Sequence, residues 1–156
     1  MIEIDVPGYK GLVLGYLVMD FNGTLAVDGV LLTGVKERLA ELGKELEIHV
    51  VTADTFGRVR EELRGVGCKV VVLEEANQVE AKGEYVKSLG GENVVGIGNG
   101  RNDRLMLQEA ELGIALVQAE GAAVETVLAA DLVCGNILDG LDLLLHPQRL
   151  VAGLRV

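Results

Sequence analysis

The sequence contains no tryptophan, and its few tyrosines and phenylalanines bring the aromatic content to only 3%. Aromatic side chains on which nucleic-acid bases could stack are therefore scarce. Basic residues are also in the minority, 14 against 24 acidic ones, and the formal net charge of -10 would repel nucleic-acid phosphates and anionic membrane surfaces. We therefore expect neither nucleic acid nor a membrane as a partner.

Long hydrophobic runs are missing as well. The longest, between residues 11 and 19, is nine residues long, whereas a membrane-spanning helix needs roughly 20. The first ten residues carry acidic side chains and no apolar segment of the kind found in secretory signals, so we expect a cytoplasmic protein. Only two cysteines occur, Cys68 and Cys134, without a CxxC pattern, and we expect both to be reduced thiols.

What the sequence does have is a regular alternation of two patterns. Short, largely apolar runs typical of strands buried on both faces occur at residues 17–19, 48–51, 70–73, 94–97, 114–117 and 132–134. Between them, apolar residues at helical spacing predict helices over residues 35–42, 56–63 and 81–89 and around residues 105–110. Repeated units of this kind predict an α/β fold, a Rossmann-like, doubly wound, mainly parallel sheet.

The N-terminal segment has a different pattern. Residues 2–8 alternate apolar and acidic side chains and then turn, and a second apolar run begins at Leu12, which predicts a small β-hairpin. A chain of 156 residues suits one substantial core, so we expect residues 1–156 to form a single domain. Inside one apolar run, we expect His49 to be half-buried with its hydrogen bonds satisfied, and not to be a metal ligand.

Polar residues directly follow three of the predicted strands, at the end where a parallel sheet binds its ligands. Asp20 follows the first strand, Thr52 the second, and the loop that contains Asn99 and Asp103 the fourth. A hydroxyl beside a helix N-terminus suits a phosphoryl oxygen, and the oxygen ligands of the later loop suit a hard cation such as Mg²⁺. Lys82, at the start of a predicted helix, could pair with both Asp20 and a phosphoryl group. Taken singly, each of these residues is typical of an ordinary turn, cap or surface position.

Taken together and in this order, these residues resemble the motifs of the haloacid dehalogenase (HAD) superfamily. Within it they resemble the phosphorylation domains of P-type ATPases and their free-standing soluble relatives. The resemblance extends from Leu17 to about Asp142. The first motif is matched by Asp20-Phe21-Asn22-Gly23-Thr24, the second by Thr52, the third by Lys82 and the fourth by Gly98-Asn99-Gly100-Arg101-Asn102-Asp103.

The resemblance implies a mechanism and a set of site residues. Asp20 would attack the phosphorus atom in line and carry an aspartyl phosphate, while Thr52 and Lys82 hold the transferred oxygens. Magnesium would bridge Asp20 and the fourth-motif loop. The residues implied in this way are Asp20, Asn22, Thr52 and Lys82 for catalysis, Thr52, Ala53, Lys82 and Asn102 for the substrate, and Asp20, Asn22 through its backbone carbonyl, Asn99 and Asp103 for the metal.

Two positions depart from the family pattern. Family phosphatases carry a second aspartate, the general acid/base, two residues after the nucleophile, and here that residue is Asn22. Because acid/base assistance contributes about 10²- to 10⁴-fold in rate, we expect slow hydrolysis, as in the P-type ATPases, which accumulate an aspartyl phosphate. The second departure is Asn99, where the family has a metal-binding aspartate. An amide brings no charge, so we expect weaker magnesium binding, with Asp103 left to compensate.

The spacing of the motifs leaves no room for a cap domain. Capless relatives act on large substrates or close the site with a neighbouring subunit, so the resemblance favours a phosphorylated small molecule or a phosphoprotein as partner, and a homo-oligomer.

The function implied is Mg-dependent phosphoryl transfer, with hydrolysis of a phosphomonoester or an acyl phosphate through Asp20. The alternative is a catalytically weak or inactive binding or regulatory module, which the pair Asn22 and Asn99 favours. A receiver-like signalling domain fits less well, because it would carry its phosphoacceptor on a later strand. The enzymatic hypothesis requires that Asp20 and Lys82 lie together, and it fails if they lie on different rims of the sheet.

Overall fold

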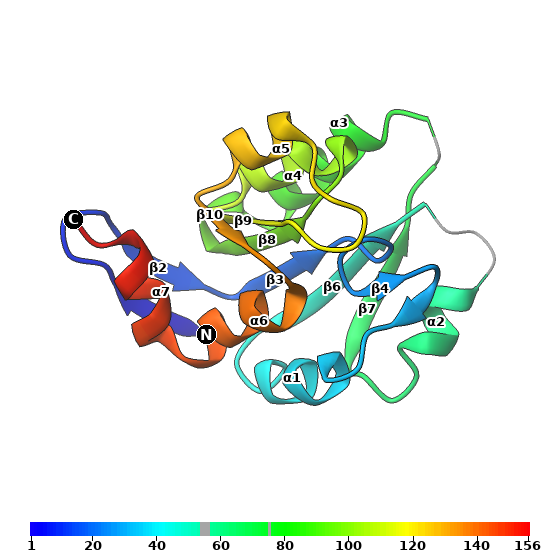
Figure 1. The fold of residues 1–156 in the computed structure, drawn as a ribbon, viewed down its shortest axis with the longest axis horizontal. Helices are drawn as coiled ribbons and strands as arrows, with labels where there is room; N and C mark the ends of the chain where they lie inside the picture. The colour runs from blue at the N-terminus through cyan, green and yellow to red at the C-terminus, as the bar shows by residue number, and fades with distance from the viewer. Residues whose placement is uncertain (54–56, 75) are drawn as a thin grey trace.

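The structure of the chain is a computed structural model that describes residues 1–53, 57–74 and 76–156. Its centre is a sheet of six parallel strands in the order β10-β9-β8-β3-β6-β7 (Figure 1). All six predicted strands are present, which confirms the expected Rossmann-like fold. Their bounds are β3 (Tyr16–Met19), β6 (Glu47–Thr52), β7 (Cys68–Val72), β8 (Val94–Gly98), β9 (Leu112–Leu116) and β10 (Leu132–Cys134).

The strand order reverses between β3 and β8. The chain runs from β3 outward to β6 and β7 on one side, then returns to β8 on the other side of β3 and continues to β9 and β10. Sheets of this kind bind their ligands at the carboxyl ends of the strands, beside such a reversal. The loops that follow β3 and β8 therefore meet at this point.

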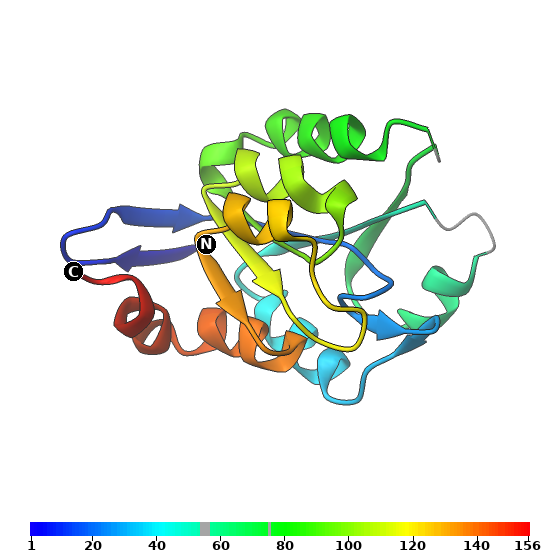
Figure 2. The ribbon, with the colours of Figure 1, turned by 45° about the horizontal axis from the view of Figure 1, so that its top comes forward.

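Helices cover both faces of the sheet, with α3, α4 and α5 on one face and α1 and α6 on the other (Figure 2). Side chains of β3 alternate between the two layers. Val18 packs on the side of α3 and α4, whereas Leu17 and Met19 belong to the core beneath α1 and α6. Burial on both faces explains why the predicted strands are continuously apolar. The helices are α1 (Val35–Leu42), α2 (Arg58–Glu62), α3 (Gln78–Ser88), α4 (Arg104–Glu109), α5 (Val124–Ala129), α6 (Ile137–Leu145) and α7 (Pro147–Leu154), with short 3-10 turns η1 (Gly91–Asn93) and η2 (Arg101–Asp103).

The predicted N-terminal hairpin is present as the antiparallel pair β1 (Ile2–Asp5) and β2 (Gly11–Leu14), which forms a small sheet of its own. Its apolar face packs against the end of the chain, where α7 buries Leu150. The amide of Val156 donates to the carbonyl of Pro7 at 3.2 Å, so the C-terminus lies beside the hairpin turn (Figure 1).

A second hairpin, β4 (Ala26–Val27) and β5 (Val30–Leu31), follows the Asp20 loop directly and was not predicted. Its signal is the Asp28-Gly29 pair, whose φ angles of 52° and 78° suit a two-residue turn of type I′. Two-residue strands are too short to produce a recognisable alternation of side chains.

The helix predicted over residues 56–63 is found as Arg58–Glu62, and Phe56, which was to share its apolar face, lies outside the described residues. Within the part of the chain that the structure describes, no helix combines the length and the apolar character needed to cross a membrane.

Candidate active site

Asp20 stands at the tip of β3 on a tightly bonded turn. Its amide donates to the carbonyl of Ile97 on β8 at 3.3 Å, which continues the ladder beyond the last residue of the strand. The amides of residues 24–26 all donate to the carbonyl of Phe21 at distances of 2.8–3.1 Å, and the Phe21 ring is wholly buried. The turn is therefore anchored, and it leaves 13% of the Asp20 side chain exposed.

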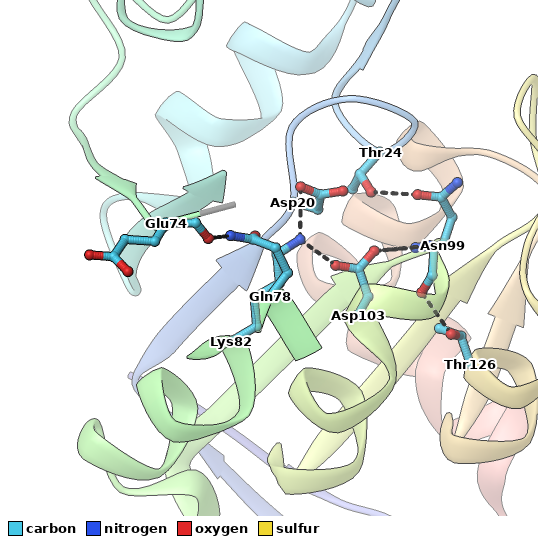
Figure 3. A network of polar contacts seen from close by, with 9 residues as sticks. Asp20, Thr24, Glu74, Gln78, Lys82, Asn99, Asp103 and Thr126 are labelled. Atoms are coloured by element: carbon cyan, nitrogen blue, oxygen red, sulfur yellow. Dashed lines mark hydrogen bonds and ion pairs between the residues drawn. The ribbon is translucent and has the colours of Figure 1, made fainter. Parts of the chain in front are cut away.

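Lys82 reaches the Asp20 carboxylate from the first turns of α3. Its side chain is 1% exposed, and its Nζ lies 3.1 Å from Asp20 Oδ1 and 2.8 Å from Asp103 Oδ1 (Figure 3). The prediction that Asp20 and Lys82 lie together is thus confirmed. Lys82 is a buried ion-pair partner of two carboxylates and not a surface lysine.

Asp103 holds the loop after β8 in shape. Its Oδ2 accepts hydrogen bonds from the amides of Asn99 and Gly100 at 2.9 and 3.0 Å, while Oδ1 faces Lys82. Gly98 makes room for this arrangement, because a Cβ at that position would lie 2.6 Å from Asp103 Cγ. Both carboxylate oxygens of Asp103 therefore contact protein donors, and its expected role as a metal ligand stays a prediction.

Burial and the neighbouring charges shift the pKa values of Asp20 and Lys82. Burial, followed by the negative charge of Asp103, raises the pKa of Asp20 to about 7, although Lys82 acts in the opposite direction. Burial lowers the pKa of Lys82, but the charges and hydrogen bonds of Asp103 and Asp20 outweigh it and raise the pKa above its usual value. Lys82 is therefore a fixed positive charge, whereas Asp20 is poised to gain or lose a proton near neutral pH.

The Asn99 side chain is buried, and its amide is oriented by neighbouring loops. Its Nδ2 donates to the carbonyl of Gly121 at 3.0 Å, and its Oδ1 accepts from the Thr24 hydroxyl at 3.4 Å. One residue later, the carbonyl of Gly100 accepts from the Thr126 hydroxyl at 2.7 Å (Figure 3). The amide oxygen of Asn99 thus points toward the turn that presents Asp20.

Gln118, on the loop after β9, ties this turn to the rest of the rim. Its Nε2 donates to the carbonyls of Gly23 and Thr24, both at 2.8 Å, and its Oε1 accepts from the amide of Ile137 at 3.0 Å. Gln118 and Thr126 were not predicted to belong to the site, and no motif marks them, because their contacts depend on which loops the fold places side by side. Thr24 belongs to the first motif, but no role was predicted for its side chain.

The other predicted residues lie at the same end of the sheet. Thr52 ends β6, the strand next to β3, and is buried, while Ala53 follows it half-buried. Asn102 lies half-buried in η2, and Asn22 is exposed on the turn after Asp20. The structure thus joins Asp20, Lys82, Asn99 and Asp103 in one polar network. It places Thr52 at the end of β6, Asn102 in η2, and Ala53 and Asn22 on the loops that follow β6 and β3. Their functional roles stay predictions.

The oxygen donors at this rim are of the kind that Mg²⁺ takes. The predicted ligands are the Asp20 carboxylate, the amide oxygen of Asn99, the backbone carbonyl of Asn22 and the Asp103 carboxylate, the last of which already contacts Lys82 and two amides. Among the described residues, no group of three histidines, cysteines or acidic side chains gathers as a metal site. Mg²⁺ needs no such cage, because it keeps several waters and uses one or two carboxylates together with substrate oxygens. The donor set therefore fits magnesium better than a softer transition metal.

Two solved structures share this architecture. One is 3-deoxy-D-manno-octulosonate 8-phosphate phosphatase from Moraxella catarrhalis, which was solved with magnesium, phosphate and a KDO molecule. It superimposes with a TM-score of 0.72 at 16% sequence identity, and the match covers 89% of this chain and 90% of that one. The other is the cobalt-bound enzyme from Haemophilus influenzae, with a TM-score of 0.71, 15% identity, and coverage of 87% and 90%. The chain therefore has the haloacid dehalogenase fold, and the described residues contain no cap domain.

No protein-family model matches the sequence. A relative is the uncharacterized protein MJ0073 of Methanocaldococcus jannaschii, which is 45% identical over 69 residues, or 44% of this chain and 74% of the relative. The chain belongs to the same protein family as MJ0073.

Proposed function

We propose that the chain is a magnesium-dependent phosphoryl-transfer enzyme that hydrolyses a phosphomonoester or an acyl phosphate through Asp20. The observation that carries the proposal is the position of the Lys82 ammonium, 3.1 Å from an Asp20 carboxylate that is largely buried yet still reachable. A buried cation beside a carboxylate at the topological switch point of the sheet suits the capture of a phosphoryl group.

The reaction would proceed in two displacements. An oxygen of the Asp20 carboxylate forms a bond to phosphorus while the bond to the leaving oxygen breaks, which gives an aspartyl phosphate. Water then attacks the phosphorus, releases inorganic phosphate and regenerates the carboxylate. Lys82 balances the negative charge throughout, and Thr52, Ala53 and Asn102 hold the transferred oxygens.

A magnesium ion would be held by Asp20, Asn22 through its backbone carbonyl, and Asn99, and when bound it offsets the repulsion between the carboxylate and the phosphoryl group. What supports this cation is the donor set and the fold shared with the M. catarrhalis phosphatase, which was solved with magnesium and phosphate. Asp103 contacts Lys82 and two loop amides. We assign it the positioning of Lys82.

Asn22 makes this enzyme slow. An amide can neither protonate the leaving group nor activate water, so both displacements lack assistance that contributes about 10²- to 10⁴-fold. The proton on the leaving group would then come from solvent, which favours substrates with good leaving groups. This property resembles the long-lived aspartyl phosphate of the P-type ATPases.

The open rim of the site bears on the substrate and on the oligomeric state. An acceptor at an uncapped rim suits a phosphorylated small molecule or a phosphoprotein in the cytoplasm. A second subunit of a homo-oligomer would be one way to cover the rim during turnover.

The experiment is phosphate release from p-nitrophenyl phosphate and from acetyl phosphate, with and without Mg²⁺. We expect turnover by the wild type only with Mg²⁺, and none by Asp20→Asn. Asp5→Asn, on the distant N-terminal hairpin, is the matched control and should behave like the wild type. If wild type and Asp20→Asn are equally inert at high protein and Mg²⁺ concentrations, the enzymatic proposal is wrong.

A second candidate is a binding or regulatory module without turnover. The neutral side chains at Asn22 and Asn99 favour it, because both positions carry acids in the family phosphatases. This module would bind phosphate or a protein partner at the same rim. Protection of the wild type by beryllofluoride and Mg²⁺ against urea unfolding, without phosphate release from either substrate, would support it.

A further inference from the structure

On the basis of the proposed function, the metal site carries little negative charge. The Asp20 carboxylate is the one anionic group among its three proposed metal ligands, since Asn99 and the Asn22 carbonyl are neutral. The carboxylate of Asp103 already faces Lys82 and two amides. A divalent cation at this rim would therefore find less negative charge than its own two positive charges.

The loop between β9 and α5 brings another acid to the same place. Gln118 fastens this loop to the carbonyls of Gly23 and Thr24, and the carbonyl of Gly121 accepts a hydrogen bond from the Asn99 side chain. Glu120 lies between these two attachment points. The backbone on either side of Glu120 is therefore held in place, and Glu120 lies against the turn that presents Asp20.

The glycine at position 23 shows how closely Glu120 approaches. A Cβ on Gly23 would lie 1.9 Å from Glu120 Oε2 and 2.8 Å from both polar atoms of the Asn99 amide. Glu120 Oε2 and Asn99 Oδ1 are therefore no more than 4.7 Å apart, the sum of those two distances. Gly23 has a φ of 81°, and any side chain there would occupy the space that the carboxylate takes.

The Glu120 carboxylate is also available. It takes part in no hydrogen bond or ion pair within residues 1–53, 57–74 and 76–156, and it is exposed. The nearby acid Glu125 differs, because its carboxylate lies 3.6 Å from Arg101 and 3.7 Å from Arg104. Among the residues that the structure describes, no basic side chain pairs with Glu120 and holds it away from the Asn99 amide.

We propose that Glu120 supplies the negative charge that Asn99 lacks, and that it binds the divalent cation together with Asp20. The charge of the metal site would thus be moved from the loop after β8 to the loop after β9. Removing the Glu120 charge should weaken cation binding at least about tenfold, because a charge this close to a divalent ion acts across a few ångströms.

The test measures Mn²⁺ binding to the full chain by electron paramagnetic resonance of free Mn²⁺, a readout that needs no turnover. We expect Glu120→Gln to raise the Kd at least tenfold and the matched control Glu125→Gln to stay within twofold of the wild type. We also expect the double variant Asn99→Asp with Glu120→Gln to recover wild-type affinity, because the charge is then restored on the neighbouring loop, after β8.

The outcomes separate this inference from the proposed function. If Asp20→Asn abolishes Mn²⁺ binding while Glu120→Gln stays within twofold of the wild type, the role of Glu120 is wrong and the metal site at Asp20 stands. If Glu120→Gln and Glu125→Gln weaken Mn²⁺ binding equally, the effect comes only from the net charge of the protein, and the inference is wrong. If the wild type binds no Mn²⁺ at millimolar concentration, the proposed metal dependence and the role of Glu120 both fail.

Discussion

Lys82 and Asp103 form an ion pair at 2.8 Å in which neither side chain is more than 1% exposed. Removing one partner of a buried pair leaves the other charge without compensation, which costs about 3 to 5 kcal/mol. We therefore expect Lys82→Met to lower the free energy of unfolding by that amount, measured by urea denaturation at pH 8.

The control for this prediction is Lys44→Met. Lys44 pairs with Glu41 at 2.7 Å, but both side chains are more than half exposed. An exposed pair contributes about 0 to 1 kcal/mol, so this variant should stay close to the wild type. If the two substitutions lower the free energy of unfolding equally, the Lys82–Asp103 pair is not shielded from water, which would contradict the structure.

Asn22→Asp should accelerate hydrolysis. The side chain is exposed on the turn after Asp20, so the substitution should change stability little. A carboxyl group there restores an acid and base beside the acceptor, which should raise the turnover of acetyl phosphate by about 10²- to 10⁴-fold. The measurement is steady-state phosphate release, combined with the lifetime of the phosphoenzyme after a substrate pulse.

Asn22→Ala is the matched control, since it removes the amide without adding an acid, and it should leave turnover close to the wild-type rate. No acceleration by Asn22→Asp, in a variant that still forms the phosphoenzyme, would mean that another group limits hydrolysis.

Gln118→Met should loosen the turn that presents Asp20. Methionine keeps most of the packing volume, but it leaves the carbonyls of Gly23 and Thr24 and the amide of Ile137 without their partner. We expect the unfolding free energy to fall by about 1 to 3 kcal/mol. Faster amide hydrogen exchange at residues 24–26 should accompany the loss. Unchanged exchange there would contradict the anchoring role of Gln118.

His49 predicts a pH dependence of stability. It is buried, its Nδ1 lies 2.5 Å from the Tyr85 hydroxyl, and its Nε2 lies 3.0 Å from Glu47, which also pairs with Lys69. Burial lowers the pKa of His49, although Glu47 acts to raise it. As the pH falls below about 6.5, the unfolded chain binds the proton before the folded chain does. The free energy of unfolding should therefore fall with decreasing pH in this range.

Asp20 has the opposite effect on stability. Because its pKa is raised in the folded chain, the folded chain binds this proton first, and the free energy of unfolding rises as the pH falls. The comparison is therefore made in the Asp20→Asn background, by urea denaturation at about pH 7, 6 and 5. We expect Asp20→Asn to lose stability across this range, and the double variant with His49→Gln to lose less. Parallel curves for the two proteins would contradict the assignment to His49.

The sequence predicted the sheet well for a physical reason. Strands buried on both faces must be apolar at every position, and this pattern is visible without knowing the partners, as residues 94–97 illustrate. The polar residues that follow these strands were predicted to meet because parallel strands end at a common rim. Asp20 follows β3 and Asp103 lies in the loop after β8, and a single lysine, Lys82, contacts them at 3.1 and 2.8 Å, which confirms this reasoning for those two strand ends.

The rest of the site depends on relations that no local pattern encodes. Glu120 and Gln118 lie on a loop whose neighbour in space, the turn at Gly23, is set by strand order and by the length of each connection. The partner of His49 was likewise unpredictable, since Tyr85 comes from the helix packed over that strand. Three helices, α5, α6 and α7, were not predicted. Helix α5 is short, whereas α6 and α7 each contain a glycine and meet at Pro147, which are the residues that usually mark loops.

The central position of strand β3 affects how the site forms as the chain folds. It pairs with β6 on one side and with β8 on the other, so Asp20 and Asn99 become neighbours only when the later half of the sheet has docked. Partly assembled chains would present the Asp20 carboxylate without Lys82 or the Asn99 amide beside it. Binding of a divalent cation would therefore report completion of the whole sheet, and it would favour the finished molecule over every earlier stage.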